Sequence, residues 1–230
     1  MKRLLSFFLL WMVSYAMNAQ EVTYSSFPHY NEKVVIFQNL PPIISTDLVM
    51  LGNSLTENGG DWNKQLRWNY VRNRGIAGDD ATGIYHRLNQ ILPGKPKAIF
   101  LMVGINDLSH DLTAHQVFEN CKMVIDKIRQ DAPETKLFVQ SILPINESFG
   151  RWKTLEGKTN VIPVINSLLR KYCAQNKVTY IDLFDKFVRR GTNEMRVSLT
   201  VDGLHLTHIG YKIWNFELRR YLLSLDSKQK

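Results

Sequence analysis

The chain has 230 residues, of which 44% are hydrophobic and 22% are charged, and its formal net charge is +8 at pH 7. This length fits one domain with its own core, and these proportions exclude wholesale intrinsic disorder. The basic residues form no Lys/Arg block and do not alternate with aromatic residues, so the positive charge predicts no nucleic-acid partner.

The N-terminus has the residue order of a secretory signal peptide. Lys2 and Arg3 precede an apolar run over residues 4–13, and small side chains follow it. The run is too short to span a bilayer comfortably. We predict a signal peptide over residues 1–19 and a single domain over residues 20–230, secreted or periplasmic, with no membrane anchor after cleavage. Cleavage three residues earlier fits equally well, and an uncleaved anchor is the alternative.

Short apolar stretches alternate with stretches of helical spacing along the rest of the chain. After an amphipathic segment over residues 29–40, five stretches have the character of buried strands: 48–51, 68–71, 98–103, 137–139 with 142–143, and 178–181. Apolar residues recur at helical spacing over 84–91, 117–128, 161–172 and about 207–223. This alternation predicts an α/β fold with a parallel five-stranded sheet and helices on both faces.

Polar or glycine residues follow three of these strands. The first strand stops at Gly52 and Ser54 comes two residues later, while Gly78 and Asn106 follow the second and third strands. Ligands of parallel sheets bind outside the carboxyl ends of the strands. A serine at such an end is held by the scaffold and open to solvent, which is where a nucleophile belongs, although ordinary turn chemistry is the commoner role of a polar residue there.

Asp202 and His205 lie three residues apart, just before the last predicted helix. A serine needs a base to become nucleophilic, and the base needs a partner that fixes its tautomer and stabilises its cation. Ser54, His205 and Asp202 supply these three roles. The alternative for His205 is a purely structural role. With His208 the pair has a spacing that suits zinc, but further strong ligands are missing, so we predict no metal.

An ester carbonyl that is attacked by serine also needs donors for the developing oxyanion. The backbone N–H of Ser54 is one candidate. Gly78 has no side chain to block a close approach to its N–H, and Asn106 carries a neutral amide donor. Turn formation is the alternative role of Gly78 and Asn106.

Four segments together resemble the sequence blocks of the SGNH hydrolases, also called GDSL esterases and lipases. They occur in the family's order across the chain, at 52–56, 73–79, 104–107 and 202–205. The resemblance implies a flavodoxin-like three-layer fold and no cofactor. It also implies that Ser54 is the nucleophile, that His205 and Asp202 are the base and its support, and that Gly78 and Asn106 complete the oxyanion hole. Asn53 departs from the family's name-giving motif, which has Asp there.

The opening block, the loop over residues 59–62 and the predicted signal peptide are similar to exported bacterial carbohydrate O-acetylesterases, including sialate O-acetylesterase-like proteins. We therefore expect a serine esterase that removes short acyl groups, above all O-acetyl, from a small-molecule or polysaccharide ester. One alternative is a lysophospholipase or thioesterase with the same machinery. Another is a non-catalytic carbohydrate-binding protein.

Some further side chains are candidates for substrate contact or crosslinking. Trp62 follows the serine loop and is a candidate wall of the site, and Arg74 is a candidate ligand for a substrate carboxylate. Trp152 has an aromatic face that suits sugar stacking, although packing is the commoner use of a Trp. Cys121 and Cys173 lie on apolar helix faces, so we expect buried thiols, with a disulfide as the alternative.

Overall fold

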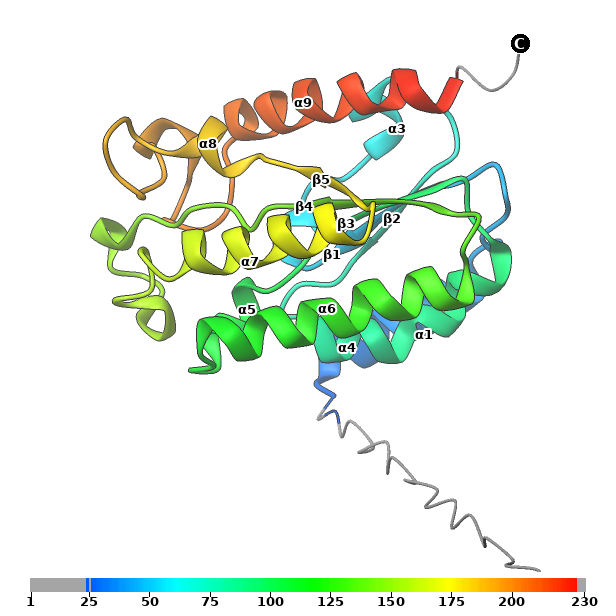
Figure 1. Cartoon of the computed structure of the whole chain (residues 1–230), viewed down its shortest axis with the longest axis horizontal. Helices are drawn as coiled ribbons and strands as arrows, with labels where there is room; N and C mark the ends of the chain where they lie inside the picture. Colours follow the sequence, from blue (N-terminus) through cyan, green and yellow to red (C-terminus); the bar gives the residue numbers. More distant parts are fainter. Residues whose placement is uncertain (1–23, 25, 227–230) are drawn as a thin grey trace, which may run out of the picture.

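One sheet of five parallel strands forms the centre of the structure (Figure 1). The computed structural model describes residue 24 and residues 26–226, so the predicted signal peptide lies outside the described residues. The strands are β1 (Leu48–Gly52), β2 (Val71–Gly75), β3 (Ala98–Met102), β4 (Lys136–Gln140) and β5 (Thr179–Ile181). Their order is β2-β1-β3-β4-β5, which confirms the predicted parallel α/β sheet.

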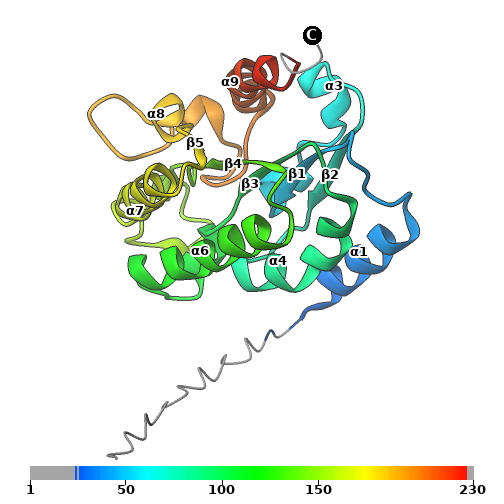
Figure 2. The ribbon, with the colours of Figure 1, turned by 45° about the vertical axis from the view of Figure 1, so that its right-hand side comes forward.

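Helices cover both faces of this sheet and complete three layers (Figure 2). The helices are α1 (Pro28–Asn39), α2 (Ser54–Glu57), α3 (Trp62–Leu66), α4 (Ala81–Arg87), α5 (Ile105–Ser109), α6 (Ala114–Asp131), α7 (Ile162–Gln175), α8 (Phe184–Phe187) and α9 (His208–Asp226). Helices α4, α6 and α7 pack on one face, and α3 and α9 pack on the other. Helix α1 lies beside α4 in both views.

Each strand contributes to two hydrophobic cores, because successive side chains point to opposite faces of a sheet. In β1, Val49 and Leu51 pack with α4, α6 and α7, whereas Leu48 and Met50 pack with α3 and α9. All four residues are 0% exposed. Burial of each such side chain stabilises the fold by roughly 1.5–3 kcal/mol. The sheet is therefore a rigid scaffold that positions the residues following its strands.

The predicted second strand over residues 68–71 is wrong in position. Strand β2 begins at Val71, and the segment before it is the turn that ends α3, with positive φ angles at Arg67 (53°) and Tyr70 (62°). The aromatic residues of this turn suggested a strand. The true strand is polar because it lies at the edge of the sheet, where Arg72 forms an ion pair with Asp47 at 3.0 Å.

The two cysteines are buried free thiols, as expected. Cys121 lies on α6 and Cys173 on α7, and both belong to the core that these helices share. Over residues 24 and 26–226, none of the helices combines the length and the apolar character that a membrane span requires.

Candidate active site

The carboxyl ends of three neighbouring strands bring together the residues expected to bind the reacting ester group. Because the sheet order is β2-β1-β3, the loops after these strands are adjacent. Ser54 follows β1, Gly78 follows β2 and Asn106 follows β3. Residues separated by more than fifty positions in sequence thus lie at one edge of the sheet.

Ser54 lies at a sharp turn between β1 and α2. Gly52 permits the turn, since a Cβ atom there would lie 2.3 Å from Thr56 Oγ1 and 2.5 Å from the Met102 carbonyl oxygen. Ser54 is the first residue of α2, so its N–H has no partner within the helix. The residue is 7% exposed. Its hydroxyl is therefore held by buried backbone, with one small opening to solvent.

Asn53 fills the position where the family motif has Asp. Its Oδ1 accepts the N–H of Leu55 at 3.1 Å and so caps the N-terminus of α2. A carboxylate would accept the same bond, which explains why an amide can replace it here. The amide Nδ2 is buried and has no hydrogen-bond partner among the described residues.

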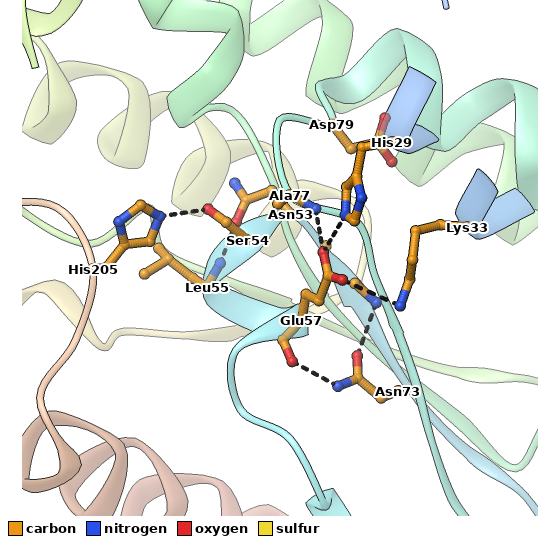
Figure 3. Close-up of polar contacts among 12 residues, drawn as sticks. His29, Lys33, Asn53, Ser54, Leu55, Glu57, Asn73, Ala77, Asp79 and His205 are labelled. Carbon is orange, nitrogen blue, oxygen red and sulfur yellow. Dashed lines mark hydrogen bonds and ion pairs between the residues drawn. The ribbon is translucent and has the colours of Figure 1, made fainter. Parts of the chain in front are cut away.

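His205 joins Ser54 to Asp202. Its Nε2 lies 3.0 Å from Ser54 Oγ, and its Nδ1 lies 2.8 Å from Asp202 Oδ2 (the first contact is drawn in Figure 3). The other carboxylate oxygen, Asp202 Oδ1, accepts the backbone N–H groups of Leu204 at 3.0 Å and His205 at 2.7 Å. Both carboxylate oxygens are used, so the imidazole has a fixed orientation toward Ser54.

The electrostatics of Asp202 suit a support for a cationic imidazole. Burial alone would raise the pKa of this carboxyl group. The hydrogen bonds from the His205 ring and from the backbone N–H groups of His205 and Leu204 outweigh burial and lower the pKa below its ordinary value. Asp202 therefore carries a negative charge beside Nδ1 at neutral pH.

Gly78 and Asn106 carry donors near the serine. Gly78 has a φ of +86°, a conformation that favours glycine, and its N–H has no acceptor within the part of the chain that the structure describes. Asn106 donates one Nδ2 hydrogen to the Asp79 carbonyl oxygen at 2.8 Å. An amide nitrogen has two hydrogens, so the second remains for a ligand. The two donors are tied to one loop, because Asp79 directly follows Gly78.

A family model described as the GDSL-like lipase/acylhydrolase family matches residues 50–213. The chain belongs to this family. Membership classes it as an ester hydrolase and confirms the resemblance seen in the sequence. The matched range contains Ser54, Gly78, Asn106, Asp202 and His205.

Two curated proteins are similar to this chain in sequence. They are the platelet-activating factor acetylhydrolase IB subunits alpha2 of Rattus norvegicus and of Mus musculus, each 26% identical over 170 residues, which are 72% of this chain and 71% of the relative.

Solved structures of similar fold include a GDSL-like lipase from Bacteroides thetaiotaomicron VPI-5482, which is 19% identical with a TM-score of 0.73 and covers 85% of this chain and 97% of its own. An acetyl xylan esterase is 21% identical with a TM-score of 0.64, and the match covers 76% of this chain and 99% of the esterase. At these identities, the likeness to the solved structures shows the fold alone.

Buried charges support the loop after β2 in this GDSL-like site. Asp79 is 0% exposed and pairs with Arg87 Nε at 2.8 Å, and Arg87 also donates to the Gly52 carbonyl oxygen at 3.1 Å. Burial raises the pKa of Asp79 to about 7, although Arg87 opposes the shift. Asp107 accepts the N–H of Ala81 at 3.1 Å, and burial raises its pKa to about 6.

The sequence did not reveal Arg87, because it lies within the predicted helix and belongs to none of the four motifs. Among the described residues, no three His, Cys, Asp or Glu side chains are grouped as a metal site requires. Asp79, Asp80 and Asp107 make contacts that support the fold. Asp80 caps α4 by accepting the N–H of Gly83 at 2.8 Å.

Trp62 and Arg74 do not reach the site, and the expectation that they contact substrate is not met. Trp62 is 1% exposed and donates to the Thr56 carbonyl oxygen at 2.9 Å. It belongs to the core between the sheet and helices α3 and α9. Arg74 is also buried, with its guanidinium 4.8 Å from the centre of the Phe37 ring. Burial lowers the pKa of Arg74 to about 10. Trp62 fills a core and Arg74 packs beneath α1.

A different aromatic side chain lies beside the catalytic candidates. The Trp152 ring packs edge-on against His205, with ring centroids 5.2 Å apart and an interplanar angle of 69°. Trp152 belongs to the long loop after β4 and is half-buried. A hollow of about 100 Å³ adjoins it and is lined also by Arg151, Asn146 and Gly203. Gly203, which lines this hollow, lies two residues before His205.

Proposed function

We propose that this protein is a serine esterase that removes a short acyl group, in particular acetyl, from a carbohydrate. The observation that carries the proposal is the continuous chain of contacts from Ser54 Oγ to His205 at 3.0 Å and from His205 to Asp202 at 2.8 Å. This arrangement is what an alcohol requires to act as a nucleophile at neutral pH.

In the proposed reaction, Ser54 Oγ attacks the ester carbonyl while His205 Nε2 takes the hydroxyl proton. Asp202 stabilises the imidazolium that forms. His205 then gives the proton to the leaving sugar hydroxyl as the bond between the carbonyl carbon and that oxygen breaks, which leaves an acyl-enzyme. Water, deprotonated by His205, attacks the acyl-enzyme and releases the carboxylic acid with regeneration of Ser54.

The oxyanion of each tetrahedral intermediate is held by the N–H groups of Ser54 and Gly78 and by the Asn106 amide. These donors are fixed before substrate arrives, because Asn106 is bonded to Asp79 and Ser54 opens a helix. Preorganised donors avoid reorganisation when charge develops, and each contributes about 3 kcal/mol to transition-state stabilisation.

The hollow of about 100 Å³ beside Trp152 is lined by none of the residues proposed to touch the reacting ester, so the support for a short acyl group comes from similar proteins. The names of the curated relatives and of one structural neighbour both refer to removal of acetyl. The half-buried Trp152 beside His205 offers an aromatic face, and the predicted export of the chain fits a polysaccharide or other external ester.

Hydrolysis of p-nitrophenyl esters of increasing acyl length tests the proposal, with the chain from residue 20 compared with its Ser54→Ala variant. We expect activity that is highest on acetate and falls by at least about a thousandfold in Ser54→Ala. Ser54→Ala with wild-type activity would sink the mechanism. Activity that rises with chain length would move the substrate to a lysophospholipid or thioester.

The alcohol part of the substrate needs a second comparison. Acetylated xylan oligosaccharides and an acetylated phospholipid should be offered to the same enzyme, with acetate release as the readout. We expect faster release from the oligosaccharides. Preference for the phospholipid would replace the carbohydrate proposal, and tight oligosaccharide binding without release would favour a carbohydrate-binding protein.

We also propose that the protein is exported to the periplasm or beyond the cell, on the strength of the signal-peptide pattern over residues 1–19. Fractionation of cells that express the chain with and without these residues tests this. Equal retention of both forms in the cytoplasm would contradict it.

A further inference from the structure

Helix α1 covers the outside of the loop that carries Gly78. A Cβ atom at Gly78 would lie 3.0 Å from Phe27 Cζ, so the residue just before α1 packs on this glycine. Tyr30 of α1 donates its hydroxyl to the Gly83 carbonyl oxygen at 3.0 Å. Figures 1 and 2 show α1 beside α4, which is the helix that directly follows this loop. An element that precedes the whole sheet thus contacts the oxyanion side of the site.

Glu57 links α1, the serine helix and this loop. Its Oε2 accepts the backbone N–H of Ala77 at 2.6 Å and lies 3.1 Å from His29 Nε2 (Figure 3). Its Oε1 lies 3.1 Å from Lys33 Nζ. Glu57 is the last residue of the helix that begins with Ser54. One carboxylate therefore connects the nucleophile's helix to the backbone of the residue before Gly78, and two α1 side chains hold it there.

The position of the Ala77 N–H matters because Gly78 is conformationally free. Glycine at a φ of +86° resists rotation less than any other residue, so its N–H direction depends on neighbouring peptides. On the preceding side, Ala77 is fixed by Glu57. On the following side, the Asp79 carbonyl is fixed by Asn106 at 2.8 Å. The Gly78 N–H lies between these two anchored peptide groups.

The contact has the character of a strong, charged hydrogen bond. Burial would raise the pKa of Glu57, but hydrogen bonds from His29, from the Ala77 N–H and from Lys33 outweigh it and lower the pKa below its ordinary value. Hydrogen bonds that an ionised acceptor makes are shorter and roughly twice as strong as neutral ones. The 2.6 Å distance to Ala77 agrees with an ionised acceptor.

We propose that Glu57, held by His29 and Lys33, is a positioning residue that keeps the Gly78 N–H directed into the oxyanion hole. Glu57 acts through the peptide of Ala77 and does not touch the substrate. The inference rests on the proposed function, since it assigns Gly78 to the oxyanion. It gives α1, which lies outside the residues matched by the family model, a part in the reaction.

Kinetics of Glu57 variants test the proposal with p-nitrophenyl acetate. In Glu57→Ala we expect kcat to fall at least about tenfold while KM stays within about twofold, because the lost interaction acts on the transition state. Glu57→Gln keeps an oxygen that can accept the Ala77 N–H and should lose only about threefold. Asp61→Ala is the matched control, since Asp61 also accepts backbone N–H groups (Asn63 and Lys64) but contacts no part of the loop.

The kinetic outcomes decide in both directions. A kcat of Glu57→Ala within about twofold of wild type overturns the proposal, and so does an equal fall in Asp61→Ala. If Glu57→Ala fails to fold by circular dichroism, Lys33→Met replaces it. Removal of this anchor should lower kcat about threefold without changing KM, and an unchanged kcat in Lys33→Met then overturns the proposal.

Amide hydrogen exchange separates this inference from the proposed function. We expect the Ala77 N–H to exchange at least about tenfold faster in Glu57→Ala than in wild type, and the Gly78 amide resonance to shift, with neither change in Asp61→Ala. Equal Ala77 exchange in wild type and Glu57→Ala overturns the inference even where the esterase is active. A wild type without esterase activity defeats the proposed function, while faster Ala77 exchange in the variant still shows that Glu57 holds the loop.

Discussion

The two sides of Ser54 are built differently. On one side, Gly78 follows the edge strand β2 and Asn106 follows the central strand β3, and the buried pair Asp79–Arg87 connects the loop of Gly78 to the end of β1. On the other side, Trp152 and its neighbours belong to a loop outside the sheet. The side of Gly78 and Asn106, which is the proposed oxyanion side, has its donors fixed by the scaffold. The residues of the loop side follow β4 and lie outside the strands of the sheet.

The loop side is nevertheless ordered by its own hydrogen bonds. Glu147 accepts the backbone N–H groups of Gly157 at 2.7 Å and Thr159 at 2.8 Å, which closes the loop on itself. Asn146 connects the loop to the turn before His205, since its N–H donates to the Gly203 carbonyl oxygen at 2.8 Å. From this difference we infer that residues after the strands stabilise the transition state and that residues of the loop after β4 select the substrate.

Removal of the Asn106 amide should give the largest effect of the changes that separate the two sides. In Asn106→Ala we expect kcat to fall about 100-fold with little change in KM, because an oxyanion donor acts mainly in the transition state. Steady-state kinetics on p-nitrophenyl acetate measure this. Asn39→Ala, which removes an exposed amide of α1, is the control. A fall of kcat below about threefold would remove Asn106 from the oxyanion hole.

Removal of the Trp152 ring should act on binding. In Trp152→Ala we expect KM for an acetylated oligosaccharide to rise about tenfold, with kcat on p-nitrophenyl acetate within about threefold of wild type, because an aromatic contact contributes on the order of 1 kcal/mol. Trp152→Phe should restore part of the affinity. If Trp152→Ala instead lowers kcat as much as Asn106→Ala does, Trp152 orients His205, and the division between the two sides fails.

The same division explains how much the sequence revealed. Ser54, Gly78 and Asn106 each follow a strand, so strand prediction and the family motifs placed them at one edge, and His205 and Asp202 lie in a short local turn. Side chains whose partners are distant were missed. Trp62 looked available in sequence, but only the packing of α3 on α9 buries it. Glu57 could not be recognised, because its partners lie on α1 and after β2.

Edge strand β2 shows another limit of sequence reasoning. Hydrophobic patterning located the four other strands, although residues 142–143, predicted as part of the fourth, follow β4 in a loop. Strand β2 contains two arginines and an asparagine, and its predicted boundaries were displaced. Arg74 is buried there, with its guanidinium against the Phe37 ring of α1. Tertiary contacts with an element remote in sequence determine this burial, so Arg74 could not be distinguished from a surface residue.

The smallest expected effect concerns acid stability and the contact between Glu57 and the oxyanion loop. The pKa of Glu57 is lower in the folded chain than its ordinary value of 4.5. The ionised form therefore adds stability that is present above the unfolded-state pKa and is lost as pH falls through the lower folded-state pKa. We expect the free energy of unfolding to decrease more between pH 6 and pH 3 in wild type than in Glu57→Gln, as measured by urea denaturation. The control for the loss of one charge is Glu134→Gln, which removes an exposed carboxylate beside Lys95. Parallel pH curves for wild type and Glu57→Gln would mean that the carboxylate gains no stability from its partners.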